Sequence, residues 1–205
     1  MENLFNGECA NAHSLLNQLV AGVDEAGRGA LAGPVVSAAV ILTPEIPSEL
    51  LKDSKTLKEQ EREEIYEILY SSTPYIGIGV VNEKIVDRIN ILQATLLSME
   101  KAIMALPILP QKVLIDGRDI PKNINLNMSA IIKGDSKIPA ISAASIIAKV
   151  TRDRIMCKLH KAQPQYNFNK HKGYGTEDHY DCIFKFGISK SHRKSFNLTK
   201  QEKMF

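Results

Sequence analysis

Three acidic residues come directly after apolar stretches of the chain, and their spacing points to chemistry at the edge of a sheet. Asp24 and Glu25 follow the apolar run 19–23, and Asp116 follows the run 113–115. Such runs are typical of buried strands, and ligands of α/β proteins usually bind at the ends of strands that face one edge of the sheet. We therefore expect these three acids to converge although they are far apart in the sequence.

A fourth acid, Asp135, lies in Lys133-Gly134-Asp135-Ser136-Lys137, just ahead of a predicted helix. Three or four clustered carboxylates cannot all stay ionised without a cation. Hard oxygen ligands with no cysteine or histidine beside them favour Mg²⁺ or Mn²⁺. Two such ions could activate water and stabilise the leaving oxygen of a phosphodiester.

A single acid at a strand end has a simpler interpretation as a solvated turn residue or helix cap, which suits Asp53, Asp87 and Asp119. This interpretation suits the adjacent pair Asp24 and Glu25 poorly, because buried acids cost free energy unless they are solvated or bound to a metal. Successive side chains of a strand also point to opposite faces. We therefore expect the strand to end or bulge at this pair.

The glycine-rich segment that follows, Gly27-Arg28-Gly29 with Gly33, superficially matches a dinucleotide-binding turn. That motif requires a helix next, whereas the run 34–42 reads as a strand. Two carboxylates directly before the glycines would also repel a pyrophosphate. The sequence therefore excludes a dinucleotide-binding fold.

The elements that must position these residues are predicted from hydrophobic spacing. Strands are expected over 19–23, 34–42, 75–81, 113–117 and 129–133, and helices over about four turns from Leu57, over 91–106 and from Ile141 to Leu159. Thr56-x-x-Glu59 matches a capping box at the start of the first helix. The alternation of strands and helices predicts an α/β fold with a mixed sheet.

The composition of the chain limits its class and its location. Its 205 residues, 44% hydrophobic and 24% charged, are typical of one globular domain and exclude collagen, a disordered chain and a disulfide scaffold. No apolar run approaches the roughly 18 to 20 residues of a membrane-spanning helix, and Met1-Glu2-Asn3 lacks the basic start of a secretory signal. The three cysteines form no Cys-x-x-Cys pair. We expect a cytoplasmic protein.

Charge is distributed unevenly along the chain. The formal charge is −4 over residues 1–150 and +7 over residues 151–205. A basic end beside an acidic body is expected where a polyanion is bound near carboxylates, although a solubilising tail would give the same pattern. His171, His179 and His192 lie in the basic part without the spacing of a metal site, and we assign them no catalytic role.

Six blocks occur together in one order: Asp24-Glu25-Ala26-Gly27-Arg28-Gly29, Gly33-Pro34, Asp53-Ser54-Lys55, Ile115-Asp116-Gly117, Ser142-Ala143-Ala144-Ser145-Ile146-Ile147-Ala148-Lys149 with Arg152-Asp153, and His171-Lys172-Gly173-Tyr174-Gly175-Thr176. Through them, residues 19–197 resemble bacterial ribonuclease HII, the type 2 ribonuclease H. The resemblance implies a ribonuclease H-like mixed sheet flanked by helices, with a C-terminal helical appendage. We expect an N-terminal extension over 1–18, a catalytic domain over 19–162, and a basic appendage and tail over 163–205.

The activity that the resemblance implies is endonucleolytic. The RNA strand of RNA/DNA hybrids would be cut, as would duplex DNA at single ribonucleotides, leaving 5′-phosphate and 3′-hydroxyl ends. By resemblance, Asp24, Glu25, Asp116 and Asp135 would hold Mg²⁺ or Mn²⁺, with two ions during turnover. Asp153 competes with Asp135 for the fourth place, but a structural ion pair is its expected role, since basic residues flank it in a helix.

Substrate recognition is expected at the glycines and in the basic part of the chain. The glycines of Gly27-Arg28-Gly29 let the backbone approach a sugar closely, and only a ribose offers a 2′-hydroxyl. By resemblance, Tyr174 would meet the sugar of the ribonucleotide and the following deoxynucleotide; a half-buried loop tyrosine is the simpler alternative. The residues expected to contact phosphates are Lys55, Lys172, Arg193 and Lys194.

Two alternatives remain open at this point. A non-catalytic nucleic-acid-binding protein could use the same fold and basic end, although the four acids argue against it. Gln201, Met204 and Phe205 form a Gln-x-x-Met-Phe pattern that resembles the short peptides by which replication and repair enzymes dock on the bacterial sliding clamp. The same apolar residues could instead fold back onto the protein's own surface.

Overall fold

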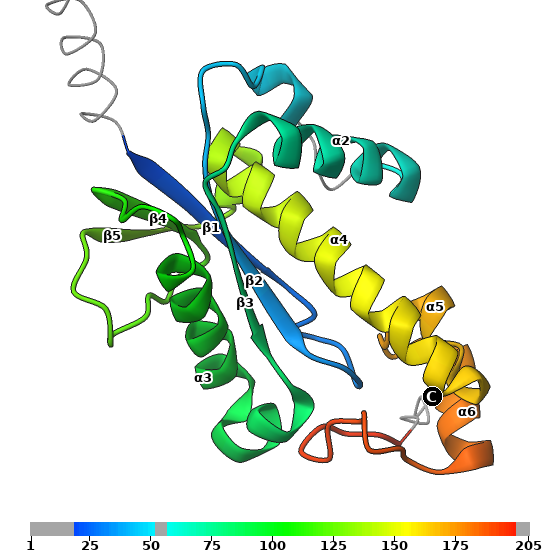
Figure 1. Ribbon diagram of the computed structural model, residues 1–205. Helices are drawn as coiled ribbons and strands as arrows, with labels where there is room; N and C mark the ends of the chain where they lie inside the picture. The colour runs from blue at the N-terminus through cyan, green and yellow to red at the C-terminus, as the bar shows by residue number, and fades with distance from the viewer. Residues whose placement is uncertain (1–18, 52–56, 200–205) are drawn as a thin grey trace, which may run out of the picture.

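The computed structural model describes residues 19–51 and 57–199, which form a five-stranded sheet with helices on both faces (Figure 1). The strands are β1 (Val20–Ala26), β2 (Val35–Ile41), β3 (Ile76–Val81), β4 (Lys112–Asp116) and β5 (Met128–Ile131), in the order β3-β2-β1-β4-β5. β1, β2 and β3 pair antiparallel, whereas β4 runs parallel to both β1 and β5. The predicted α/β class with a mixed sheet is confirmed.

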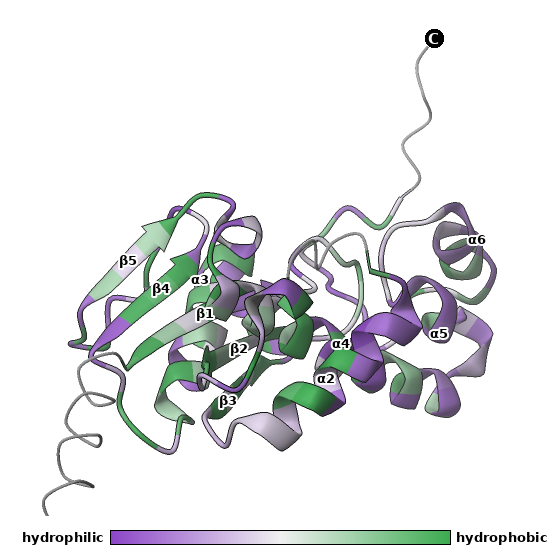
Figure 2. Cartoon of the chain, turned by 90° about the horizontal axis from the view of Figure 1, so that it is seen from above, coloured by the Kyte–Doolittle hydropathy of each residue, from purple (hydrophilic) through white to green (hydrophobic). Residues whose placement is uncertain are grey.

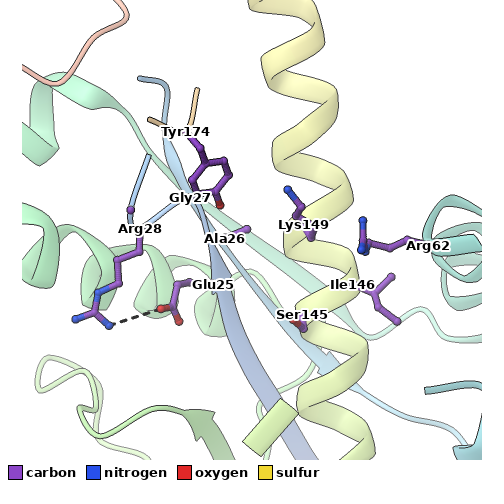
Figure 3. Close-up of a pocket in the computed structure, with 10 residues that line it drawn as sticks. Glu25, Ala26, Gly27, Arg28, Arg62, Ser145, Ile146, Lys149 and Tyr174 are labelled. Atoms are coloured by element: carbon purple, nitrogen blue, oxygen red, sulfur yellow. Dashed lines mark ion pairs between the residues drawn. The ribbon is translucent and has the colours of Figure 1, made fainter. Parts of the chain in front are cut away.

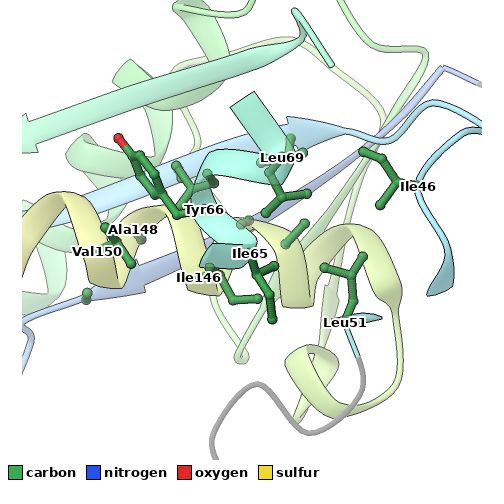
Figure 4. Close-up of a cluster of buried hydrophobic side chains, with 14 residues drawn as sticks. Ile46, Leu51, Ile65, Tyr66, Leu69, Ile146, Ala148 and Val150 are labelled. Carbon is green, nitrogen blue, oxygen red and sulfur yellow. The ribbon is translucent and has the colours of Figure 1, made fainter. Parts of the chain in front are cut away.

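Two apolar cores lie on opposite faces of the sheet. On one face, Ala21 and Val23 of β1 pack with Met99 of α3 (Glu83–Met104). On the other face, Ala26 belongs to a buried cluster with residues of α2 (Glu59–Ser72) and α4 (Pro139–Ala162). Figure 4 shows Leu69 of α2 and Ile146 of α4 in this cluster. Alternate residues of β1 therefore face different helices, and this alternation decides where its acids point.

The predicted start of the first helix is wrong. α2 begins at Glu59, where the Lys58 backbone N–H donates to Glu61 Oε2 at 2.7 Å; Thr56 lies outside the described residues. On this helix Ile65 and Leu69 are buried, whereas Ile68 is 41% exposed.

The helix predicted over 91–106 is the second part of a longer one. α3 begins at Glu83 but is interrupted at Asn90, whose φ is +65°. The Asn90 side chain accepts a 3.1 Å hydrogen bond from the backbone N–H of Gln93 and so caps the second part, as Asn does at helix starts. The periodic apolar spacing begins only after this cap.

The chain after α4 is helical, in agreement with the C-terminal helical appendage that the resemblance implied. It contains η3 (Pro164–Tyr166), α5 (Phe168–His171) and α6 (Glu177–Phe186). Figure 2 shows this end as predominantly hydrophilic beside the apolar strands of the sheet. Within the described ranges, no helix combines the length and the apolar character needed to cross a membrane.

The expectation that β1 ends or bulges at its acids is also wrong. Asp24 and Glu25 remain in regular antiparallel register with Ala38 and Ser37 of β2. The strand can continue through both acids because each carboxylate has a polar partner, Ser145 for Asp24 and Arg28 for Glu25.

Candidate active site

The two adjacent acids of β1 point to opposite faces of the sheet. Asp24, 5% exposed, accepts a 2.7 Å hydrogen bond from the Glu25 backbone N–H and a hydrogen bond from Ser145 of α4. Glu25 lies on the face of α3 and forms an ion pair of 3.7 Å with Arg28 (Figure 3). Each carboxylate is therefore held by a donor from a different part of the fold.

Asp116 ends β4 next to these two acids. The parallel register pairs Val23 with Ile115, so Asp24 and Asp116 occupy the following positions of two neighbouring strands. Asp116 Oδ1 accepts a 2.6 Å hydrogen bond from the backbone N–H of Gly134. This register places Asp24 and Asp116 at the same end of two neighbouring strands.

The three carboxylates repel one another. Burial raises the pKa of Asp24 well above its ordinary value, and the charges of Glu25 and Asp116 raise it further. Burial also raises the pKa of Glu25; Arg28 opposes this rise and Asp116 adds to it. A cation at this edge would relieve the repulsion between the carboxylates.

The chemistry of the donors fits a hard divalent cation, because all three candidate ligands are carboxylates. In the part of the chain that the structure describes, no three acidic, histidine or cysteine side chains already converge on one point. Each of the three carboxylates instead forms a hydrogen bond or an ion pair with a group of the protein itself. Binding of a cation would therefore require some of these side chains to change their rotamers.

Asp135 lies beside this group in a separate cavity. It is buried in η2 (Gly134–Ser136) and lines a small cavity with Leu51 and Ser142. The backbone N–H of Gly134 donates to Asp116, and Asp135 is the residue that follows Gly134.

A cavity of about 360 Å³ opens beside Glu25 (Figure 3). It is lined by Glu25, Ala26, Gly27, Arg28, Gly29, Arg62, Ser145, Ile146, Lys149 and Tyr174. Three of these side chains, Arg28, Arg62 and Lys149, are cationic. A cavity with three cations and the carboxylate of Glu25 at its wall suits a polyanion bound beside an acidic group.

Three segments far apart in the sequence are joined by backbone hydrogen bonds behind this cavity. Leu31 N–H donates to the Gly173 carbonyl, Gly33 N–H to Ser191, and Arg193 N–H to Leu31, each at 2.8 Å. The turn after β1 is therefore fixed between the Tyr174 loop and the segment 189–193.

The buried side chain of Arg152 in α4 joins two of these segments, the turn after β1 and the Tyr174 loop, by hydrogen bonds. Its side chain is 0% exposed and donates to the carbonyls of Pro34 at 3.0 Å, Lys172 at 2.9 Å and Ala32 at 3.1 Å. Bonds from one charged group to three backbone acceptors hold the site before any substrate binds.

Comparison with known proteins identifies the family. The family model described as Ribonuclease HII matches residues 21–199, nearly all of the described chain. The chain belongs to the ribonuclease HII family. It is therefore an endoribonuclease with ribonuclease H activity on RNA/DNA hybrids.

Ribonuclease HII of Coxiella burnetii is 53% identical over 189 residues, covering 92% of this chain and 93% of its own. The solved PCNA:RNase HII complex of Archaeoglobus fulgidus contains a chain 26% identical to this one, with a TM-score of 0.72 and coverage of 90% and 98%. Bst-RNase HIII, solved in complex with Mn²⁺, is 20% identical with a TM-score of 0.67 and coverage of 97% and 74%; this likeness shows the fold alone. The predicted ribonuclease H-like fold is confirmed.

Two basic residues of this ribonuclease HII do not have the role that the sequence predicted. Arg193 is 0% exposed and donates to the carbonyls of Gly33 and Arg28, each at 3.0 Å. Lys172 is buried and its Nζ donates to Glu59 at 3.0 Å and to the Asn169 carbonyl at 2.7 Å. Arg193 is enclosed in the protein and Lys172 is paired with the exposed Glu59. Both cations therefore already have partners, and the predicted phosphate contact is corrected to a positioning role.

The other predicted phosphate contacts are placed differently. The side chain of Lys194 is exposed, and its backbone N–H donates to Asp87 at 3.0 Å, so its ammonium faces solvent. Lys55 lies outside the described residues. Asp153 forms the expected structural ion pair, with Lys149 at 2.9 Å.

Sequence reasoning missed two cations and a hydroxyl of the site. Ser145 and Lys149 are one helical turn apart in α4 and both line the cavity; their spacing of four residues was a usable signal. Arg62 reaches the cavity from α2, and no local pattern marks it.

The two glycines of Gly27-Arg28-Gly29 should respond differently to substitution. Gly27 has a φ of +91°, and a Cβ there would lie 1.9 Å from Arg152 Nε, whereas a Cβ at Gly29 meets no atom within 4 Å. We expect Gly27→Ala to lower the free energy of unfolding by about 2 kcal/mol or more and Gly29→Ala to change it by less than about 0.5 kcal/mol. Denaturant unfolding measures both, and equal losses would contradict the packing described for Arg152.

Proposed function

We propose that this ribonuclease HII is a metal-dependent endonuclease that cuts the RNA strand of RNA/DNA hybrids and also cuts duplex DNA at single ribonucleotides. The observation that carries the proposal is the cavity itself. Arg28, Arg62 and Lys149 line it together with Glu25, and the buried Asp24, whose charge and that of Glu25 repel each other, is the preceding residue of the same strand. This arrangement matches a phosphodiester that needs both charge neutralisation and a bound cation.

Asp24, Glu25 and Asp116 would hold the cation, with Asp135 as the fourth ligand. We propose two ions of Mg²⁺ or Mn²⁺, and a ribonuclease HIII neighbour was solved with Mn²⁺. Bound ions of this kind supply a nucleophile at neutral pH and stabilise the leaving oxygen of a phosphodiester. The protein supplies the carboxylates, the positions of the strands and the donors that orient each carboxylate.

Selectivity for a ribonucleotide is assigned to the turn after β1 and to Tyr174. The backbone at Gly27 and Gly29 lines the cavity without side-chain bulk, which permits hydrogen bonds to a 2′-hydroxyl. The Tyr174 ring also lines the cavity (Figure 3), with Lys149 Nζ 5.4 Å from the centre of the ring. Contacts of the Gly27 and Gly29 backbone and the Tyr174 ring with a sugar would recognise a ribonucleotide independently of its base.

Phosphates on either side of the reacting sugar would be bound by basic side chains. We assign this role to Arg28, Arg62, Lys149 and Lys194, and also to Lys55, which lies outside the described residues. Such contacts give affinity and salt dependence but no sequence preference. We also propose a cytoplasmic location.

An RNA/DNA hybrid with one labelled strand tests metal dependence and separates the enzyme from a non-catalytic binding protein. We expect cleavage of the labelled RNA strand with Mg²⁺ or Mn²⁺, and intact hybrid with EDTA. Binding of the hybrid without cleavage in either metal would support the binding protein instead.

Tyr174→Ala is expected to lower cleavage at a single ribonucleotide by about tenfold or more, because the lost contact lies at the reacting sugar. Affinity for an all-DNA duplex should change by less than about twofold, since phosphate contacts dominate it. Tyr174→Phe should retain most of the cleavage if the ring makes the contact. Tyr70→Ala, in α2 outside the cavity, is the control. Equal losses of binding and turnover in Tyr174→Ala would make Tyr174 a structural residue.

Residues 201–205 are proposed to bind a sliding clamp through Gln201, Met204 and Phe205, which lie outside the described residues. A related archaeal ribonuclease HII was solved in complex with PCNA, which supports a partner of this kind. We expect deletion of 201–205 to abolish clamp binding in a pull-down and to leave cleavage of a short duplex unchanged. Loss of thermal stability on deletion, without clamp binding by the full chain, would show that these residues fold back onto the protein.

A further inference from the structure

Three histidines lie buried behind the Tyr174 loop, outside the cavity and without a role in the proposed chemistry. His179 is 0% exposed and His192 1% exposed. The rings of His171 and His179 stack with centres 4.3 Å apart, and the Nε2 atoms of His179 and His192 are 3.1 Å apart. The three rings come from α5, α6 and the segment after α6.

The hydrogen bonds of His192 and His179 fix which ring nitrogen carries the proton. The backbone N–H of Ser189 donates to His192 Nδ1 at 2.9 Å, so this nitrogen is an acceptor and His192 Nε2 carries the proton. His192 Nε2–H then donates to His179 Nε2, which leaves the proton of His179 on Nδ1. His179 Nδ1–H donates to the carbonyl of Tyr174 at 3.0 Å.

His171 is fixed in the same way. Its Nδ1 accepts from the backbone N–H of Gly173 at 3.1 Å, so its Nε2–H donates to the Tyr166 carbonyl at 2.8 Å. The backbone N–H of Tyr174 in turn donates to the His171 carbonyl at 2.9 Å. The backbone N–H and the carbonyl of Tyr174 are therefore both hydrogen-bonded to residues of the histidine cluster.

Every bond in this chain requires a neutral ring, because an added proton would place two donors face to face. Burial lowers the pKa of all three rings, to about 4 for His179 and His192. The charged or titratable groups around the cluster are Asp178 of α6, Lys170 of α5, and His160 of α4.

We infer that His171, His179 and His192 are positioning residues, and that a hydrogen-bond chain through their neutral rings holds the Tyr174 backbone at the cavity wall. The inference rests on the proposed role of Tyr174 at the sugar of the ribonucleotide. The chain runs from Ser189 through His192 and His179 to the Tyr174 carbonyl, so it links the segment after α6 to the cavity.

Long-range ¹H–¹⁵N spectra of the histidine side chains in the full chain test the hydrogen-bond chain independently of activity. We expect the proton on Nδ1 in His179 and on Nε2 in His171 and His192 at neutral pH. On acidification His179 and His192 should stay neutral to well below the ordinary histidine pKa of 6.5. A proton on Nε2 of His179, or titration of these two rings near 6.5, would overturn the inference.

Two variants of His179 test the consequence for catalysis. Asn places an amide donor near the Nδ1 position and so keeps the bond to Tyr174, whereas Gln places its amide near Nε2 and loses that bond. We expect His179→Asn to keep kcat/KM at a single ribonucleotide within about threefold and His179→Gln to lose about tenfold, with unchanged affinity of both for an all-DNA duplex. Equal losses in the two variants would refute the positioning role. Failure of the wild-type protein to cut this substrate would instead refute the proposed function, leaving the spectra as the test of the chain.

Discussion

Asp24→Asn and Asp116→Asn are each expected to lower cleavage of an RNA/DNA hybrid by at least ~100-fold, the scale on which enzymes lose electrostatic stabilisation of a transition state. Both carboxylates lie at neighbouring ends of parallel strands, where a cation would be held by them together. Initial rates at saturating Mg²⁺ measure the effect, with hybrid affinity determined separately in EDTA.

Asp24→Asn should not lower the free energy of unfolding, although it lowers cleavage. Burial and the charges of Glu25 and Asp116 raise the pKa of Asp24 above its ordinary value of 3.8, so the native state binds this proton more tightly than the unfolded chain. The contribution of Asp24 to the free energy of unfolding therefore falls as pH rises above 3.8. We expect the variant to be as stable as wild type or more stable at neutral pH.

Asp181→Asn is the matched control, because it removes the same charge from an exposed position on α6. It should retain wild-type cleavage. Activity of Asp24→Asn or Asp116→Asn within tenfold of wild type would remove these acids from the catalytic group.

Arg152→Leu is expected to cause the largest loss of stability, about 3 kcal/mol or more in the free energy of unfolding. It leaves the buried carbonyls of Ala32, Pro34 and Lys172 without their donor, and a buried polar group left without its partner costs about 1–3 kcal/mol. Because these carbonyls belong to the segments that form the site, hybrid cleavage should fall even where the variant remains folded.

Arg154→Leu is the comparison two residues further along α4. Arg154 lies near the surface and pairs with Glu63 and with Glu67, the latter at 2.7 Å, and exposed pairs contribute about 0–1 kcal/mol. Denaturant unfolding of the two variants should differ by about 2 kcal/mol or more. Similar stabilities would show that Arg152 does not tie the site together.

The position of Asp24 and Asp116 in the fold could be predicted because it depends on the order of the strands. An apolar run followed by an acid marks both β1 and β4, and a parallel pairing brings the two acids together. What could not be predicted is that β1 continues through Asp24 and Glu25. Each acid is satisfied by a residue remote in sequence or by a neighbouring turn, Ser145 for Asp24 and Arg28 for Glu25, and local propensity does not contain that information.

The basic residues were the least predictable part of the site. Arg193 and Lys172 look like phosphate contacts in the sequence, but their partners are carbonyls and a carboxylate that only the folded chain brings within reach. Arg62 reaches the cavity only because α2 packs beside α4. Charge is visible in a sequence, whereas its burial depends on tertiary contacts.

Cleavage of duplex DNA that contains one ribonucleotide tests the central claim most directly. A 5′-labelled duplex, incubated with Mg²⁺ or Mn²⁺ and analysed at nucleotide resolution, should be cut once on the 5′ side of the ribonucleotide, leaving a 3′-hydroxyl on the upstream fragment and a 5′-phosphate on the downstream one. Wild-type protein should give this product, and Asp24→Asn should not. An uncut duplex in both metals, or cuts at deoxynucleotides away from the ribonucleotide, would contradict the account.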